Sequence, residues 1–391
     1  MRLPVRAVFA VTLIAACDNG TDPGGRPGYA IGLALVDSTV GSISDIALVR
    51  APGGQIHLAY SQDGISTLRY ATCTTSCTIA GQWQVVTVDT AYDAGLAPSL
   101  ALGSGTALHV AYQRQSGPTR ELRYATCAAA CTTAANWQVA IVDAAGGYTP
   151  ALALDGAGGV HVVENDLRRL TYAACVTGCA TPANWELTVL DSASYVGASP
   201  TALARDTAGV LHLLYERQSG SVIHLLYARC TATCGDSASW TRVLVDSVAY
   251  MGAPALRVGA GGRLEATYFR AAPGITLVYA RCDSGCATAA NWHSLALDAT
   301  ASAGYNGFIV SGGGAYVSFR TGGGDLRYAE CAALCLGSGD WTFVSVDSLH
   351  NAFQNSALWA TGHFNAGIAF LRAGDPGGRL LYAQAQPTMP D

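Results

Sequence analysis

Cysteine pairs are the most regular reactive groups in this 391-residue sequence. Two cysteines separated by three residues occur six times within one motif, Tyr-Ala-x-Cys-x3-Cys-x5-Trp-x5-Asp, and no copy contains an insertion. Paired thiols can bind a metal or form a disulfide, but a zinc site needs further ligands, and no histidine recurs at a constant spacing near the pairs. The sequence therefore predicts structural disulfides, with no metal and no other cofactor. The expected pairs are Cys73–Cys77, Cys127–Cys131, Cys175–Cys179, Cys230–Cys234, Cys282–Cys286 and Cys331–Cys335.

A second group that could do chemistry is the segment Glu164-Asn-Asp-Leu-Arg-Arg169, which departs from the pattern of the other repeats. Two carboxyl groups can supply an acid together with a base or nucleophile to a glycosidic bond. Glu164 and Asp166 are therefore the candidates for a catalytic role. Because no paired-carboxylate or nucleophile motif is recognisable, the sequence assigns no catalytic residue.

Tyrosines and arginines recur at two further positions of the repeat. An aromatic ring can stack on a sugar, and an arginine can hold a carboxylate through paired hydrogen bonds. The alternative is that the tyrosines fill a central channel and the arginines are solvated or pair with neighbouring carboxylates. The candidate ligand-binding residues are Tyr92, Tyr148, Tyr195, Tyr250, Tyr305, Arg114, Arg217, Arg270, Arg320 and Arg372.

Short β-strands must position these residues. Half of the composition is hydrophobic and 45 residues are glycine, and short apolar runs alternate with turn residues, which indicates an all-β protein. The second repeat contains four such runs, at Pro98–Leu102, Leu108–Tyr112, Glu121–Thr126 and Trp137–Val142. Seven Tyr-Ala pairs recur every 48 to 55 residues, which predicts a seven-bladed β-propeller of four-stranded antiparallel blades.

The two ends of the chain are expected to close this ring. Ile31–Asp37 matches the fourth, outermost strand of a repeat, and Leu380–Ala383 matches a third strand. The seventh repeat has no fourth strand of its own, so the N-terminal strand is predicted to complete the last blade. A β-solenoid or another blade number would leave strand-like runs without a place.

The predicted topology divides the turns between two faces of the ring. The cysteine motif joins the third strand to the fourth on one face. The links between blades, and the turns from second to third strand, lie on the other, which we call the loop face. Because the segment from Asp to the next Tyr varies in length between repeats, we expect any binding site on the loop face. His57, His109, His161 and His212 are expected to make polar contacts between blades, and the motif tryptophans to pack between neighbouring sheets.

The N-terminus has the features of an export signal. Arg2 and Arg6 precede a short apolar run, and Leu13–Cys17 resembles the sequence at which bacterial lipoproteins are cleaved and lipidated. An ordinary secretory leader is the alternative. We expect an exported protein anchored in the cell membrane or outer membrane, facing the periplasm or the cell exterior. The expected divisions are a signal peptide at 1–16, lipidated Cys17 and a flexible tether at 17–28, the propeller at 29–385 and a tail at 386–391.

The charge pattern limits the partners. The net charge is −5 and the sequence contains no lysine and no concentrated basic segment, which argues against a nucleic-acid partner. The expected partners are the membrane, through the lipid on Cys17, and a glycan or protein ligand.

The repeat pattern Leu-Ala-Leu…His-Val-x-Tyr…Leu-Arg-Tyr-Ala over residues 29–385 resembles bacterial secreted propellers of the sialidase-like (BNR-type) class. Blades of that class often carry an Asp-box where this chain has its cysteine motif, and no Asp-box is present here. The resemblance implies the fold, but the arginine triad, Tyr/Glu pair and acid of sialidases cannot be assembled from the spacing. The sequence favours a lipid-anchored, non-catalytic propeller that recognises a glycan or protein through the loop face. The alternative is a sialidase-like glycosidase or lyase acting on an acidic glycan.

Overall fold

The structure is a computed structural model. The residues that it describes are 29–38, 45–62, 67–166, 168–192, 201–248, 251–271, 274–302, 304, 306–349, 352–362, 365–374 and 377–387.

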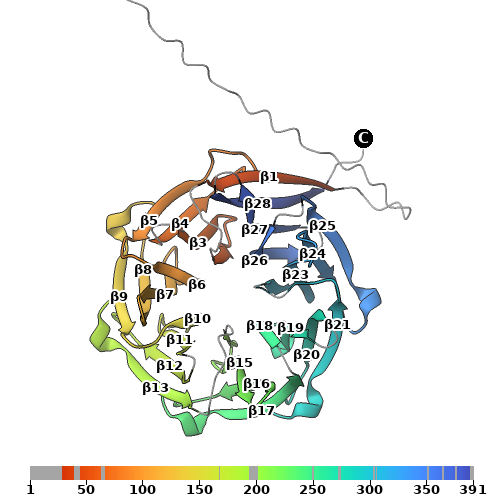
Figure 1. Cartoon of the computed structure of the whole chain (residues 1–391). Helices are drawn as coiled ribbons and strands as arrows, with labels where there is room; N and C mark the ends of the chain where they lie inside the picture. The colour runs from red at the N-terminus through yellow and green to blue at the C-terminus, as the bar shows by residue number, and fades with distance from the viewer. Residues whose placement is uncertain are drawn as a thin grey trace, which may run out of the picture.

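Seven four-stranded sheets form a ring (Figure 1), which confirms the predicted seven-bladed propeller, and their first strands line a central channel. Consecutive strands pair antiparallel and run outward from the channel, because each is joined to the next by a short turn. Blade one contains β2 (Ile46–Arg50), β3 (Ile56–Gln62), β4 (Thr67–Cys73) and β5 (Gln84–Asp89). Blade two contains β6 (Ala94–Leu102), β7 (Leu108–Ser116), β8 (Thr119–Cys127) and β9 (Gln138–Asp143). Blade three contains β10 (Tyr148–Leu154), β11 (Val160–Asn165), β12 (Leu170–Cys175) and β13 (Glu186–Asp191).

The remaining blades repeat this order. Blade four contains β14 (Ala202–Arg205), β15 (Leu211–Ser219), β16 (Val222–Cys230) and β17 (Thr241–Val248). Blade five contains β18 (Met251–Val258), β19 (Leu264–Ala271), β20 (Ile275–Cys282) and β21 (His293–Asp298). Blade six contains β22 (Gly307–Ser311), β23 (Gly314–Arg320), β24 (Leu326–Cys331) and β25 (Thr342–Asp347). Blade seven contains β26 (Ala352–Gly362), β27 (Asn365–Gly374), β28 (Gly377–Pro387) and the N-terminal strand β1 (Tyr29–Asp37).

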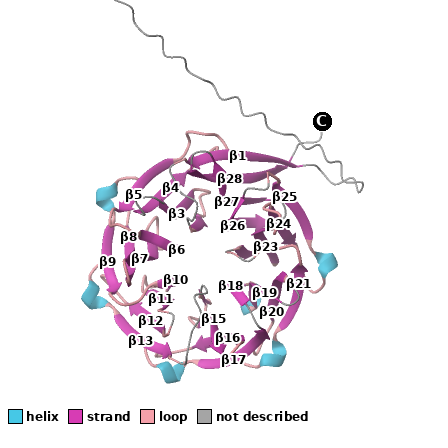
Figure 2. Ribbon diagram, in the orientation of Figure 1, coloured by secondary structure: helices cyan, strands magenta, loops and turns pink. Residues whose placement is uncertain are grey.

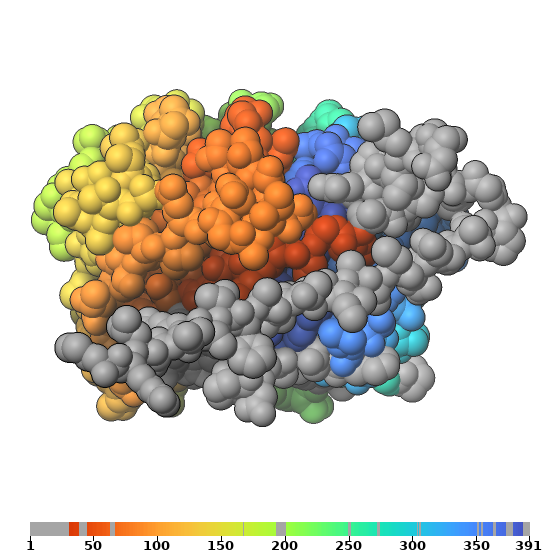
Figure 3. Space-filling model, turned by 90° about the horizontal axis from the view of Figure 1, so that it is seen from above, coloured from red at the N-terminus to blue at the C-terminus, as the bar shows by residue number. Residues whose placement is uncertain are grey.

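The ring is closed by this N-terminal strand, as the sequence predicts. β1 pairs antiparallel with β28, so that Leu33 lies opposite Ala383 and Leu35 opposite Leu381. Figure 3 shows β1, in red, between the orange strands of blade one and the blue segments of the C-terminal end. Main-chain hydrogen bonds between the two ends of the chain therefore hold the last blade together.

The cysteine motif forms the turn between the third and fourth strands. All six predicted disulfides are present, with the two Cα atoms of each pair 5.7 or 5.8 Å apart. In five of the six turns a short 3-10 helix leads into the motif tryptophan, and these helices lie at the rim of the ring (Figure 2). They are η1 (Ala134–Asn136), η2 (Pro182–Asn184), η3 (Ser237–Ser239), η5 (Ala289–Asn291) and η6 (Ser338–Asp340); η4 (Ala260–Gly262) lies in a first hairpin of blade five.

The motif tryptophans join neighbouring blades, which confirms the prediction for them. Trp137 of blade two packs its ring 5.3 Å from the ring of Tyr70 in blade one, and its indole N–H donates to the Cys131 carbonyl at 2.8 Å. The same tyrosine-on-tryptophan contact recurs around the ring. Each boundary between blades thus has its own apolar core, since the hydrophobic clusters join strands of two adjacent sheets.

The repeated histidines have a different role from the predicted one. His57 Nδ1 bonds the hydroxyl of the motif Tyr70 at 2.6 Å, and both residues belong to blade one. His109, His161 and His212 make the same bond within their own blades. The prediction of a contact between blades was wrong because the register of β3 on β4 places His57 opposite Thr72, within reach of Tyr70. Glu265 replaces the histidine in blade five and accepts a hydrogen bond from Tyr279.

Candidate functional site

The closing Asp of the motif holds adjacent blades together on the loop face. Asp89 of blade one accepts hydrogen bonds from the Tyr112 hydroxyl at 2.7 Å and from the Arg123 guanidinium at 2.8 Å, both in blade two. We call this arrangement the inter-blade clasp. It also forms where β1 meets blade one. The aspartates at the other boundaries have similar partners, with the arginine on the third strand in blades one and six and on the second strand in blades four, five and seven: Asp37 with Tyr60 and Arg69, Asp191 with Tyr215 and Arg217, Asp246 with Tyr268 and Arg270, Asp298 with Arg327, and Asp347 with Arg372.

The predicted ligand-binding arginines lie on the loop face and have partners within the protein. Arg217, Arg270 and Arg372 belong to inter-blade clasps, at 3.9, 3.3 and 2.7 Å from their aspartates. Arg114 pairs with Glu121 at 3.0 Å. Arg320 donates to the Ala352 carbonyl at 2.7 Å and to the Ser302 hydroxyl at 3.2 Å. These contacts fit the alternative in which the arginines pair with neighbouring groups, and the binding role stays a prediction.

Two of the five predicted tyrosines are described. Tyr92 is 65% exposed, and its carbonyl accepts a hydrogen bond from Arg114. The Arg120 guanidinium lies over the ring of Tyr148, 4.9 Å from its centroid, which is a cation–π contact. Tyr195, Tyr250 and Tyr305 lie outside the described residues.

The boundary between blades two and three departs from the clasp. Its closing aspartate is Asp143, and the next blade carries Glu164 where blade two has Tyr112, and Thr171 where it has Arg123. Asp143 accepts a hydrogen bond from the Ala145 amide at 2.8 Å. In the described part of the chain, no Tyr or Arg bonds to Asp143, whereas one or both do so at the other six boundaries.

Glu164 is fully buried on the loop-face end of β11. Its Oε2 accepts a hydrogen bond from the Gly147 amide at 2.6 Å, whereas Oε1 has no hydrogen-bond partner within the described residues. Burial raises the pKa of Glu164 to about 8; the negative charges of Asp143 and Asp166 also raise it, and the Gly147 amide and the Thr171 hydroxyl lower it. Glu164 therefore keeps its proton at neutral pH.

Asp166 follows two residues later and has the opposite protonation state. Its Oδ2 accepts from Arg169 Nε at 2.7 Å, and its Oδ1 accepts from the amides of Arg168 and Arg169. Partial burial raises the pKa of Asp166, but the hydrogen bonds from Arg169 and from the two amides outweigh this effect and lower the pKa overall. One strand end thus carries a protonated and an ionised carboxyl group, which is the division of roles that an acid–base pair needs.

The site borders the central channel. Asn165, between the two carboxyl residues, donates to the Thr149 hydroxyl at 3.4 Å, and Thr149 lines the channel together with the first strands of all seven blades. The channel has a volume of about 710 Å³. Sequence reasoning found Glu164 and Asp166 through the break in the repeat, and missed Asp143, whose place in the clasp pattern was recognised from the structure.

Two further properties concern cofactors and membranes. The part of the chain that the structure describes has no group of three His, Cys, Asp or Glu side chains arranged to hold a metal ion. Among the same residues, no helix has the length and apolar character required to cross a membrane.

Comparison with known proteins identifies similar structures only. No protein-family model matches the chain, and no curated protein matches it. The solved structure of polysaccharide lyase Uly1 is 10% identical with a TM-score of 0.56, over 95% of this chain and 94% of that chain. An ulvan lyase of family PL25, bound to -[GlcA(1-4)Rha3S]-, is 11% identical with a TM-score of 0.51, over 90% and 93%. The endosialidase of phage phi92 is 9% identical with a TM-score of 0.53, over 93% and 70%. The likeness is one of fold.

Proposed function

We propose that this protein cleaves an acidic glycan, as a glycosidase or a lyase, at the loop face between blades two and three. The observation that carries the proposal is Glu164, a buried carboxyl group at the boundary where the inter-blade clasp is lost. A buried carboxyl group next to Asp143 and Asp166 destabilises the fold, and perturbed acids of this kind cluster at functional sites. The polysaccharide lyases and endosialidase that share the fold are consistent with a glycan substrate.

The chemistry follows from the two protonation states. In a glycosidase, Glu164 donates its proton to the glycosidic oxygen as the bond to the sugar carbon breaks, and water adds to that carbon. The ionised Asp166 stabilises the positive charge on the sugar ring or activates the water. In a lyase, a base removes the proton next to the substrate carboxylate, and Glu164 protonates the departing oxygen. Arg168, whose side chain is exposed, and Arg120 can attract the acidic groups of the substrate.

Access to Glu164 requires the link between blades two and three to move. The Gly146–Gly147 turn lies against the carboxyl group, and a Cβ atom on Gly146 would come within 2.5 Å of Glu164 Oε1. Gly147 has a φ of 102°, a conformation that favours glycine. We propose that substrate binding displaces this turn and brings the proton of Glu164 to the bond that breaks.

Non-catalytic binding of a glycan or protein is the second candidate, and the burial of Glu164 favours it. A side chain with 0% exposure touches no substrate unless the turn moves. In that case Tyr148 and Arg120 would be the binding groups, and Glu164 would only shape the loop face.

Cleavage of defined polysaccharides separates the two candidates. The purified protein is incubated with ulvan, alginate, polygalacturonate, hyaluronan and polysialic acid, and new reducing ends and unsaturated uronates are measured. We expect cleavage of at least one, with a rate about 100-fold lower in Glu164→Gln and in Asp166→Asn. Glu186→Gln, an exposed carboxyl on β13, is the matched control and should keep full activity. No cleavage of any polysaccharide, or equal rates in wild type and Glu164→Gln, would refute catalysis.

We further propose that the protein is exported and held by lipid on Cys17, which lies outside the described residues. Six disulfides are typical of proteins in oxidising compartments outside the cytoplasm. Labelling of cells with an alkyne fatty acid should mark the wild-type protein and not Cys17→Ser. Labelling of both, or of neither, would contradict lipidation at Cys17.

A further inference from the structure

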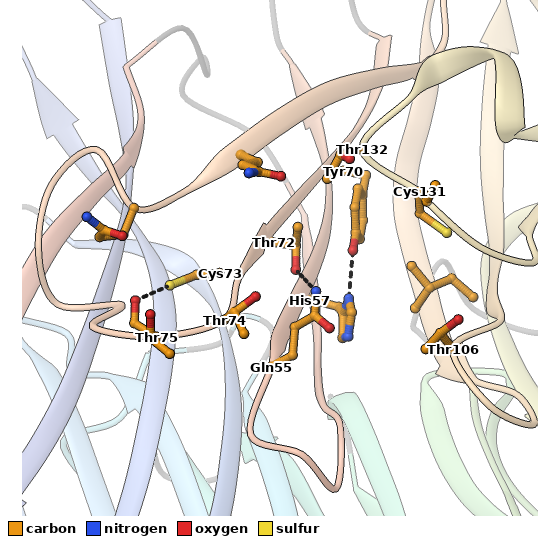
Figure 4. Close-up of a pocket in the computed structure, with 14 residues that line it drawn as sticks. Gln55, His57, Tyr70, Thr72, Cys73, Thr74, Thr75, Thr106, Cys131 and Thr132 are labelled. Atoms are coloured by element: carbon orange, nitrogen blue, oxygen red, sulfur yellow. Dashed lines mark hydrogen bonds between the residues drawn. The ribbon is translucent and has the colours of Figure 1, made fainter.

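A second cavity lies on the opposite face from Glu164, between blades one and two. It has a volume of about 410 Å³, within the range of small-molecule sites. Its lining comes from β3, β4, β5 and the cysteine turn of blade one, and from β7 and the turns of blade two (Figure 4). Its wall contains the polar side chains of Gln55, Thr72, Thr74, Thr75, Gln82, Gln84, Thr106 and Thr132.

Comparison with the boundary between blades five and six explains why this cavity is open. There, Arg263 takes the position of Gln55 and Arg281 that of Thr72. The Arg263 guanidinium reaches across to the Gly313 carbonyl at 3.2 Å, and that of Arg281 reaches the Leu334 carbonyl. Gly313 and Leu334 correspond to Thr106 and Ala130, which line the cavity between blades one and two. The shorter Gln55 and Thr72 leave open the space that two arginines cross in blade five.

The polar lining is not a requirement of the repeat. At the next boundary, between blades two and three, Ala107 stands at the position of Gln55, Gly158 at that of Thr106 and Ala180 at that of Thr132. Thr126 and Gln138 do stand at the positions of Thr72 and Gln84 there. Residues that the architecture needs recur around the ring, since the motif tyrosine occurs in all seven blades and the motif tryptophan in blades one to six. Gln55, Thr106 and Thr132 are the polar residues that the next boundary lacks, and they are free to serve a ligand.

The cavity wall offers hydrogen bonds without charge. Gln55 Nε2 donates to the Thr72 hydroxyl at 3.0 Å, which donates to the Ile56 carbonyl at 2.8 Å, so Gln55 is held in place with its amide oxygen available as an acceptor. The side-chain amides of Gln82 and Gln84 make no hydrogen bond within the described residues. Amides and hydroxyls both donate and accept, which suits the hydroxyl groups of a sugar.

The floor of the cavity is also neutral at physiological pH. Burial lowers the pKa of His57 to about 4 and raises the pKa of Tyr70 to about 12, with a small opposing effect of the Thr72 hydroxyl on Tyr70. Their 2.6 Å hydrogen bond therefore joins two uncharged groups. A carboxylate or sulfate would find no arginine in this wall, whereas a neutral ligand leaves no charge unpaired.

From this geometry we infer a second ligand site, in which the cavity between blades one and two binds a neutral, hydroxyl-rich ligand, namely one unit of an uncharged sugar. The site is separate from Glu164 and does not depend on the proposed catalysis. It would let the protein hold a neutral glycan on the cysteine-turn face while the loop face stays open.

The test measures binding of galactose, glucose, mannose, rhamnose and N-acetylglucosamine to the exported chain by saturation-transfer NMR and calorimetry. The variant Gln55→Arg/Thr72→Arg copies the side chains of blade five. It should lower the affinity for the best-binding sugar at least tenfold. The variant Gln82→Ala/Gln84→Ala changes two exposed positions of the same cavity and should also weaken sugar binding. It replaces the first variant in the test if that variant does not fold. Gln138→Ala, the equivalent of Gln84 in blade two, and Glu164→Gln should bind like wild type.

Two results would overturn the inference. One is that none of these sugars binds. The other is that binding persists unchanged in both cavity variants while circular dichroism shows them folded. A loss of polysaccharide cleavage in Glu164→Gln with intact sugar binding would keep the two sites distinct.

Discussion

Replacing Glu164 with glutamine should remove a pH-dependent loss of stability. Glutamine has the shape of the protonated acid and can keep an oxygen in front of the Gly147 amide, so the packing around the site is preserved. The folded protein binds the Glu164 proton more tightly than the unfolded chain, because the pKa rises from 4.5 to about 8 on folding. The contribution of Glu164 to the unfolding free energy of the wild type is therefore complete below pH 4.5 and is lost as the pH rises toward 8.

The size of the effect follows from the pKa. Each pKa unit corresponds to about 1.4 kcal/mol, so between about pH 5 and about pH 8 the wild type should lose about 4 kcal/mol of unfolding free energy relative to Glu164→Gln. Chemical denaturation of both proteins at a series of pH values measures this difference. The exposed Glu186→Gln should show a pH profile parallel to that of the wild type. If the wild type and Glu164→Gln lose stability in parallel, Glu164 is not a buried acid with a raised pKa.

Four other substitutions test the parts of the structure around the site. Asp89→Asn should destabilise the protein by about 3 kcal/mol in urea, because it leaves Tyr112 and Arg123 with a weaker partner. Asp143→Asn should cost less than about 1 kcal/mol in the same assay, since a Tyr–Arg clasp is absent there, and equal costs would contradict the distinction. Trp137→Ala should cost about 4 kcal/mol, because its buried ring joins two blades; a change below about 1 kcal/mol would argue against this role. Cys73→Ser/Cys77→Ser should leave the protein folded and lower its unfolding free energy by about 2 kcal/mol, since the disulfide closes a short loop; failure to fold would mean that the turn has a larger role.

The repeat spacing is sufficient to predict the fold. The motif fixes one hairpin per unit, and the match of Ile31–Asp37 to a fourth strand predicts the closure that β1 and β28 form. Asp37 even takes the place of a motif aspartate, since it accepts a hydrogen bond from Tyr60. These features follow from local sequence, because each strand is bounded by turn residues and each unit repeats the same pattern.

The site could be predicted only in part. The departure of Glu164 from the repeat is visible in the sequence, but its burial and the loss of the clasp at Asp143 depend on how two blades meet. The same limit explains the wrong prediction for His57, whose partner depends on strand register. The sequence did contain a signal for the clasp, since Tyr60, Tyr112, Tyr215 and Tyr268 each lie 22 to 24 residues after a motif-type aspartate. The cavity beside Gln55 could not be predicted in this way, because its wall is formed by turns of two different repeats.

A crystal structure of Glu164→Gln with an oligosaccharide of the polysaccharide that the wild type cleaves tests the proposed function most directly. The proposal predicts a sugar unit on the loop face of blade three, with its glycosidic oxygen in hydrogen-bond distance of the residue 164 side chain and the Gly146–Gly147 turn displaced. An oligosaccharide bound elsewhere on the ring, with that turn still closed over residue 164, would contradict it.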